Sequence, residues 1–136
     1  MAINYEFLDS FCRQVIEKDR SVRWAAVVNK NGVILTQKVR EGVNLLLSEE
    51  ENEQYAASVI VRQRTRSKFE PKIGKMVYAF GRYERLHRAT IPINENYYML
   101  ITLEVEEKNF DSIIMDKIVP LIAEKKNQII TMDDSI

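Results

Sequence analysis

The sequence is poor in the residues that build cross-links, metal centres and phosphate-binding loops. Its 136 residues include one cysteine, one histidine, four glycines and three prolines. A single cysteine excludes a disulfide within the chain, and together with one histidine it supplies too few ligands for a cysteine- and histidine-based zinc site. The few glycines form neither a phosphate-cradling loop nor a nucleophile elbow. We therefore expect no metal, no cofactor and no enzymatic activity.

The chain also lacks net charge and long apolar runs. Twenty Lys and Arg residues balance twenty Asp and Glu residues, which argues against nucleic acid as the main partner. No apolar run approaches the roughly 18 residues of a membrane span, and no apolar leader opens the sequence, so we expect a cytoplasmic protein. The length predicts one domain over residues 1–136, with a core at about 5–130 and a frayed tail from Met132 to Ile136.

A polar turn gives the clearest local signal. Asn29-Lys30-Asn31-Gly32 lies between two apolar segments and predicts a hairpin with strands at 22–28 and 33–39. Before it, apolar residues recur at three-to-four spacing after Asn4, which predicts a capped helix over 5–18. The lone Cys12 falls on the apolar side of that helix and is expected to be a buried structural thiol.

The rest of the chain continues the alternation of helices and strands. A capping-box spacing at Ser48 and Glu51 begins a helix predicted over 48–66. Three further strands are expected at 76–80, 86–93 and 97–105, followed by a helix that Asn109 caps and Pro120 kinks or restarts. The first and fifth strands are the most apolar, so they belong in the middle of an antiparallel sheet with helices on both faces.

This order of elements, α-β-β-α-β-β-β-α, resembles the roadblock and dynein light-chain domains of the profilin-like and longin-like group. The resemblance rests on the order and on the strand–turn–strand Ala25-Ala26-Val27-Val28-Asn29-Lys30-Asn31-Gly32-Val33-Ile34. It implies an α/β (α+β) three-layer sandwich whose five-stranded sheet has the order 2-1-5-4-3. It also implies homodimers that pair through the third strand and the second helix, and that bind small GTPases or act as scaffolds. Sensor domains of the PAS and GAF type contain similar hairpins.

The predicted third strand is the candidate dimer edge. An unprotected apolar edge is an aggregation hazard in a monomer, which is an independent reason to expect a partner there. The residues expected at this edge are Met76, Val77, Tyr78 and Phe80.

The stretch from Arg62 to Arg88 is strongly basic, with nine Lys or Arg residues against two acidic ones. It is either a surface for an acidic partner, a phosphate ligand or nucleic acid, or a set of solvated side chains at a helix end and in loops. The candidate partner-binding residues of this basic patch are Arg62, Arg64, Arg66, Arg82, Arg85 and Arg88.

Tyr83 and His87 suggest a possible ligand pocket, because an imidazole beside guanidinium groups can bind an anion. Strand alternation tempers this hypothesis. It places His87 and Arg88 on opposite faces, and a lone histidine beside apolar neighbours is more often a packed core residue.

The sequence thus favours a non-enzymatic regulatory or scaffolding domain that homodimerises and binds a protein partner, with a small GTPase or a related light-chain-like protein as the partner class. The alternative is a PAS- or GAF-type domain that senses a small ligand. A third hypothesis is a nucleic-acid accessory protein that uses the basic patch.

Overall fold

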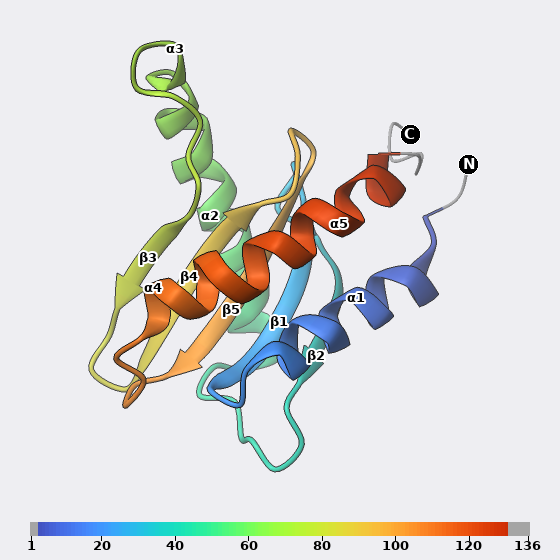
Figure 1. Cartoon of the computed structure of the whole chain (residues 1–136), viewed down its shortest axis with the longest axis vertical. Helices are drawn as coiled ribbons and strands as arrows, with labels where there is room; N and C mark the ends of the chain where they lie inside the picture. Colours follow the sequence, from blue (N-terminus) through green and yellow to red (C-terminus); the bar gives the residue numbers. More distant parts are fainter. Residues whose placement is uncertain (1–2, 131–136) are drawn as a thin grey trace.

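The computed structural model describes residues 3–130 and folds them around one antiparallel sheet of five strands in the order β2-β1-β5-β4-β3 (Figure 1). This is the order predicted from the sequence. The elements are α1 (Tyr5–Lys18), β1 (Val22–Asn29), β2 (Ile34–Val39), α2 (Glu49–Ser67), α3 (Glu70–Ile73), β3 (Ala79–Arg82), β4 (Leu86–Pro92), β5 (Tyr97–Glu104), α4 (Phe110–Ile113), the π-helical turn η1 (Ile114–Ile118) and α5 (Val119–Ile130).

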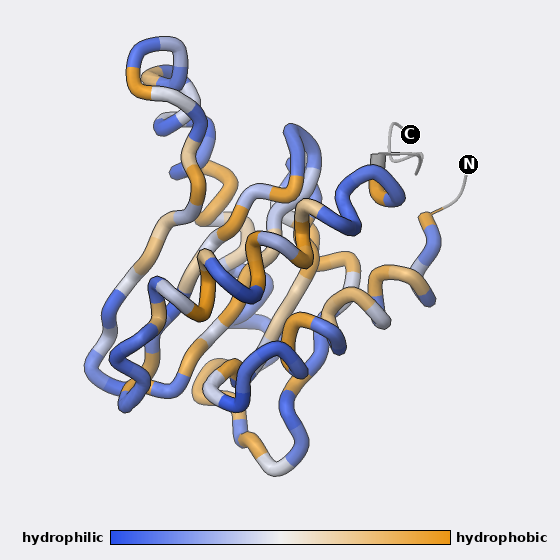
Figure 2. Tube along the Cα trace, viewed as in Figure 1, coloured by the Kyte–Doolittle hydropathy of each residue, from blue (hydrophilic) through white to orange (hydrophobic). Residues whose placement is uncertain are grey.

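The helices form two outer layers around the sheet. Helices α1, α4 and α5 cover one face and α2 lies on the other, so the three-layer sandwich is confirmed (Figure 1). The larger core joins α1 residues such as Phe11 to Ile101 of β5 and Ile118 of η1. A smaller core under α2 contains Trp24 and Val59. Figure 2 shows hydrophobic residues along the central strands and hydrophilic ones in the turn between β3 and β4.

Local hydrogen bonds form the first hairpin as predicted. The Asn29 side-chain oxygen accepts from the amides of Asn31 and Val33 at 2.9 and 3.1 Å, which closes the turn between β1 and β2. Gly32 completes the turn with a φ of 81°, a conformation that favours glycine. A Cβ atom on Gly32 would lie 2.8 Å from the Cα atom of Ala57, so this glycine also lets α2 approach the hairpin.

The helix starts follow the predicted capping residues, with one difference. The Asn4 side chain accepts from the Phe7 amide at 3.0 Å, and Ser48 and Glu51 form the reciprocal capping box that begins α2. Asn109 occupies the N-cap position of α4 but makes no side-chain cap hydrogen bond.

The prediction for the third strand needs correction. The strand runs over Ala79–Arg82 instead of 76–80, and Gly81 lies inside it, paired with Arg88 of β4. The sequence suggested a turn at Gly81 because glycine usually interrupts strands. In the structure, the ring of Tyr83 occupies the space that a side chain at position 81 would need, 3.1 Å from an ideal Cβ. The turn follows later and is closed by a hydrogen bond from the Tyr83 amide to the Leu86 carbonyl.

The last helical run does not stop at Pro120, but its hydrogen bonding changes just before it, from the π-helical turn η1 to α5. A proline ring clashes with the carbonyl oxygen four residues earlier in a regular α-helix. Here the wider turn η1 precedes it directly, and α5 continues from Val119. The tail predicted to fray from Met132 to Ile136 lies outside the described residues.

Candidate functional site

Strand β3 leaves one side of the sheet open. Among residues 3–130 it pairs only with β4, so its outer backbone groups have no strand partner. The face of β3 that points toward α4 is anchored, since the ring of Phe80 stacks on Phe110 of α4 with centroids 4.1 Å apart. Just outside the ends of the strand, Val77 and Tyr83 are 53% and 55% exposed. An open edge flanked by exposed apolar side chains is suited to pairing with another strand.

Of the four residues predicted at this edge, only Phe80 belongs to β3. Met76, Val77 and Tyr78 lie in the extended segment that leads into it. The Met76 amide donates to the Glu70 carboxylate at 3.3 Å, and the Tyr78 hydroxyl donates to Asp111. The aspartate and partial burial raise the pKa of Tyr78 to about 12, with burial the larger cause.

Helix α2 has a charged outer surface that changes sign along its length. Its first turn carries Glu49, Glu50 and Glu51, and its last third carries Arg62, Arg64 and Arg66, all exposed. These charges also favour the helix itself, because they oppose its dipole at each end. Val61 is 61% exposed on the same surface.

Beyond α2 the chain projects past the sheet before it enters β3 (Figure 1). Two large apolar side chains of this projection point to solvent: Phe69 is 57% exposed and Ile73, at the end of α3, is 82% exposed. Val61 of α2 and Val77, before β3, are also exposed apolar residues.

The structure divides the six arginines of the predicted basic patch. Arg62, Arg64 and Arg66 lie on α2, whereas Arg82 is the last residue of β3 and Arg85 lies in the turn that follows it. Arg88 is only 5% exposed, so its assignment to a surface patch is corrected. The reason is that α2 covers the face of β4 that carries Arg88.

Tyr83 and His87 are also separated. Tyr83 is exposed in the turn after β3, whereas His87 is buried at 3% exposure on the opposite face from Arg88, as strand alternation predicted. The His87 ring packs against Phe80 and Phe110 with centroids 5.2 and 5.5 Å apart. The two residues thus lie in different environments, and neither lines the pocket described next.

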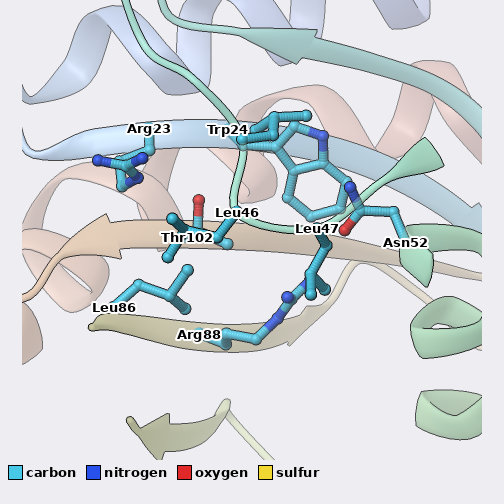
Figure 3. A pocket seen from close by; sticks show the side chains of 9 residues that line it. Arg23, Trp24, Leu46, Leu47, Asn52, Leu86, Arg88 and Thr102 are labelled. Carbon is cyan, nitrogen blue, oxygen red and sulfur yellow. The ribbon is translucent and has the colours of Figure 1, made fainter. Parts of the chain in front are cut away.

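A small pocket opens on the α2 side of the sheet, under the segment that joins β2 to α2 (Figure 3). The enclosed space is about 10 Å³, room for about one water molecule, and the open mouth brings the empty volume to about 250 Å³. Three consecutive leucines of the joining segment form one wall, and Leu45 and Leu46 are 37% and 53% exposed at the mouth. The lining residues are Arg23, Trp24, Leu45, Leu46, Leu47, Asn52, Leu86, Arg88 and Thr102.

The two arginines of this pocket differ in their partners. Arg23 has a counter-charge: its Nη1 atom donates to both carboxylate oxygens of Glu104 at 3.0 Å, and its Nη2 atom donates to the Asn44 carbonyl at 3.0 Å. These bonds hold the leucine-bearing segment to the sheet.

Arg88 makes no ion pair within residues 3–130. Its guanidinium carbon lies 3.5 Å from the centroid of the Tyr55 ring and 5.7 Å from that of Trp24. Its buried Nε and Nη2 atoms have no hydrogen-bond partner in the part of the chain that the structure describes. Burial lowers the pKa of Arg88, and Tyr55 opposes that shift.

The sequence interpretation missed this pocket. Two signals were present: an arginine inside the predicted strand 86–93, and the run Leu45-Leu46-Leu47 in a segment without helix or strand periodicity. Neither signal predicts the pocket alone, because the two segments are about 40 residues apart in sequence and meet only after α2 packs on the sheet.

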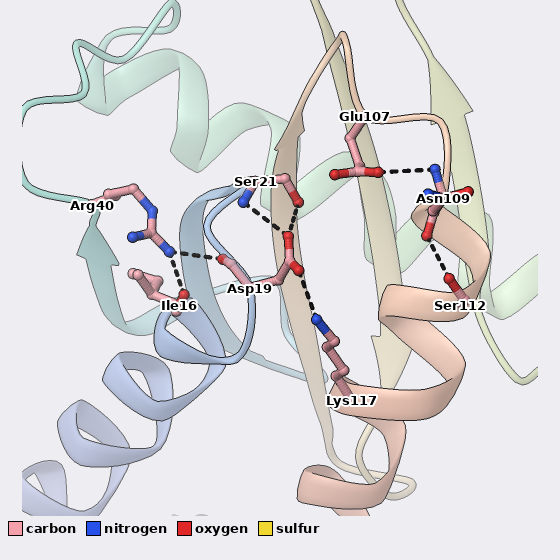
Figure 4. Close-up of polar contacts among 8 residues, drawn as sticks. All are labelled: Ile16, Asp19, Ser21, Arg40, Glu107, Asn109, Ser112 and Lys117. Atoms are coloured by element: carbon pink, nitrogen blue, oxygen red, sulfur yellow. Dashed lines mark hydrogen bonds and ion pairs between the residues drawn. The ribbon is translucent and has the colours of Figure 1, made fainter.

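A polar network on the other face joins α1, η1 and the hairpin (Figure 4). Asp19 accepts from the amide and hydroxyl of Ser21 and from Lys117 Nζ, the last at 2.8 Å. Partial burial alone would raise the pKa of Asp19, but these donors outweigh it and lower the pKa to about 2. Arg40 donates to the carbonyls of Ile16, Asp19 and Val22. We interpret the network as structural.

Cys12 fits the structural role predicted for it. Burial raises the pKa of its thiol to about 12, so it stays protonated at neutral pH. Among residues 3–130, no three His, Cys, Asp or Glu side chains are grouped to hold a metal ion, and no helix is long and apolar enough to cross a membrane.

With this geometry, the fold is that of a Roadblock/LC7-type domain. A Roadblock/LC7 domain from Streptomyces avermitilis superposes with a TM-score of 0.71 at 9% identity, covering 91% of this chain and 98% of that one. An MglB described with a tetrameric arrangement gives 0.70 at 11% identity, covering 95% and 90%. Myxococcus xanthus MglB gives 0.65 at 11% identity, covering 95% of both chains.

The chain belongs to the family described as "Family of unknown function (DUF6659)", whose model matches residues 1–130. No curated protein sequence matches it. At such low identity the solved structures establish the fold alone.

Proposed function

We propose that this chain is a non-enzymatic regulatory or scaffolding module that pairs with a second copy through β3 and α2 and binds a partner protein on the paired surface. The observation that carries the proposal is the reversal of charge along α2, beside an open strand edge.

The strand edge supports pairing with an identical chain. Two copies related by a two-fold axis bring the same strand together in antiparallel orientation, which continues an antiparallel sheet across the interface. A second copy would also cover exposed apolar side chains of α2 and of the segment that leads into β3, among them Val61 and Val77.

The charges of α2 fit the same symmetry. Two α2 helices that run antiparallel place the acidic start of each beside the basic end of the other. Parallel helices would instead bring acid to acid and base to base, which is repulsive. Val61, between the charged ends, would lie close to the middle of the contact.

The solved relatives and the roadblock resemblance support the finer parts of the proposal. One of the MglB structures has a tetrameric arrangement, which favours self-association in this fold. The resemblance adds the partner class, a small GTPase or a related light-chain-like protein. The exposed arginines of α2 are the candidate contacts for an acidic surface on that partner.

The first test measures self-association. We expect light scattering across a concentration series to give a dimer for the wild type, and Val61→Glu to weaken association by roughly tenfold or more because it buries a carboxylate at the contact. Met115→Glu is the matched control, since Met115 is a partly exposed apolar residue of η1 in the opposite helical layer. A wild type that stays monomeric, or equal effects of the two variants, would contradict the proposal.

A mixing experiment tests the antiparallel orientation. Arg62→Glu with Arg66→Glu makes α2 mainly acidic, whereas Glu50→Lys with Glu53→Lys makes it mainly basic. We expect each double variant to self-associate less than the wild type, and an equimolar mixture to recover a heterodimer. If the mixture stays as dissociated as its components, the helices do not pair in this way.

The partner class is tested separately. The wild type is used as bait in lysate of its source organism. The lysate is supplemented with either GDP or a non-hydrolysable GTP analogue. Nucleotide-dependent enrichment of a GTPase that Arg62→Glu with Arg66→Glu diminishes would support the proposed partner. Capture that is independent of both the nucleotide and the substitutions would count against it.

A further inference from the structure

The strongest feature outside the proposed pairing surface is the pocket that contains Arg88. A buried guanidinium without a counter-charge is costly, because its hydration is lost and no carboxylate replaces it. Arg88 is only 5% exposed, yet it makes no ion pair within residues 3–130. Contacts with the rings of Tyr55 and Trp24 offset part of this cost.

The unpartnered atoms have a specific arrangement. Nε and Nη2 lie on the same edge of a guanidinium, and their two N–H bonds point in parallel. This edge matches the two oxygens of a carboxylate, which accept both bonds in a bidentate pair. The third nitrogen is not among the buried unpartnered atoms, so the missing partner corresponds to one edge of the group.

The surroundings of Arg88 are amphipathic. Leu45, Leu46, Leu47 and Leu86 supply apolar surface, and the amide of Asn52 supplies a polar group. In Figure 3 the Leu47 side chain lies beside the Arg88 guanidinium. A ligand that fits these walls has one carboxylate and a short apolar tail. The enclosed space is only about 10 Å³, so the tail must be short and must displace the leucines of the joining segment.

We propose that this pocket binds a small monocarboxylic acid, with its carboxylate paired to Nε and Nη2 of Arg88 and its short apolar tail against the leucines that join β2 to α2. Both nitrogens are covered in the present conformation, with the Tyr55 ring of α2 on one side, so we infer that the leucine-bearing segment moves aside on entry. That segment contains no helix or strand, and two of its leucines are already exposed. The proposal is independent of self-association.

Trp24 provides a direct readout, because it is the only tryptophan of the chain and lines the pocket. The probes are acetate, butanoate and 4-methylpentanoate at pH 7.5, with 4-methylpentanamide as the neutral match and chloride as the simple anion. We expect saturable changes in Trp24 fluorescence and a rise in melting temperature, strongest for 4-methylpentanoate, with a dissociation constant roughly in the millimolar range for so few atoms.

Two matched substitutions localise the effect. Arg88→Met keeps most of the side-chain volume and removes the guanidinium group, so the affinity for 4-methylpentanoate should fall at least tenfold. Because this variant also removes an uncompensated buried charge, we expect it to fold with an unchanged or higher melting temperature. Arg62→Met is the control, since Arg62 is exposed and lies over the same Tyr55 ring, 5.6 Å from its centroid, without lining the pocket. It should respond like the wild type.

Three outcomes would overturn the proposal. The first is no response of the folded wild type to any of the carboxylates up to tens of millimolar. The second is an equal response to the amide or to chloride, which would show that no carboxylate is recognised. The third is an Arg88→Met variant that binds 4-methylpentanoate as the wild type does. A chemical-shift change of the Arg88 Nε–H group on binding would place the ligand directly at the Nε and Nη2 edge of the guanidinium group.

Discussion

Replacing Gly32 with alanine tests how closely α2 is held against the first hairpin. Gly32 has a φ of 81°, and an added Cβ would lie 2.8 Å from the Cα atom of Ala57 in α2. The left-handed backbone costs alanine about 1 kcal/mol. The contact adds about 2 kcal/mol, since it falls well inside van der Waals distance and the opposing atom belongs to a helix backbone that cannot rotate away. We therefore expect a loss of about 3 kcal/mol.

Gly42→Ala is the matched control for this prediction. Gly42 has nearly the same φ, 83°, but nothing lies within 4 Å of its ideal Cβ position. It should lose only the backbone part, about 1 kcal/mol. For a domain of this length these losses correspond to roughly 10 °C and 3–4 °C in melting temperature.

The assay is urea unfolding monitored by circular dichroism at one fixed protein concentration, because self-association would make stability depend on concentration. The difference between the two variants isolates the contact with Ala57. Equal losses at positions 32 and 42 would refute the packing argument. A loss at position 32 that falls between the losses expected for the two variants would show that α2 moves away at little cost.

Two further predictions concern the polar contacts. Because the pKa of Asp19 is lowered, the stability that its carboxylate contributes is complete above about pH 4 and is lost as the pH falls toward 2. Asp19→Asn should therefore cost about 2 kcal/mol at pH 7 and progressively less in acid. A difference in unfolding free energy between wild type and variant that is constant from pH 7 to pH 2 would contradict this. Ser48→Ala should cost about 1 kcal/mol, because it removes the acceptor of the Glu51 amide at the start of α2. Ser112→Ala is the control, because the Ser112 hydroxyl donates only to the Asn109 carbonyl at the start of α4. Equal unfolding free energies for the two serine variants would contradict the capping role.

The parts of the fold that sequence reasoning predicted depend on short-range chemistry. The turn at Asn29 and Gly32 and the capping box at Ser48 each involve hydrogen bonds between residues at most four apart, so their residue types indicate the structure directly. Hydrophobicity placed the first and fifth strands in the middle of the sheet, because strands buried on both faces read as continuous apolar runs. The full strand order was implied by the roadblock resemblance.

The features that sequence reasoning missed depend on distant segments. Gly81 lies inside a strand because the Tyr83 ring fills its missing side-chain space, which no periodicity reveals. Alternation correctly placed His87 and Arg88 on opposite faces, but it could not show that both faces are covered. The coverage of Arg88 comes from α2, which lies 20 or more residues earlier in the chain.

Helix α2 links the two proposals, so the experiments have to separate its two sides. Its outer surface carries Val61 and the charged ends, whereas Asn52 lines the pocket and Tyr55 covers Arg88. Arg62 bridges the two sides through the ring of Tyr55. A carboxylate at position 62 would therefore act on the dimer contact and also place a negative charge near Arg88. Arg62→Met changes the dimer contact without placing a negative charge near Arg88, so helix pairing and carboxylate binding are both measured in that variant. Loss of pairing with carboxylate binding retained would separate the two surfaces, since a general disturbance of α2 would abolish both.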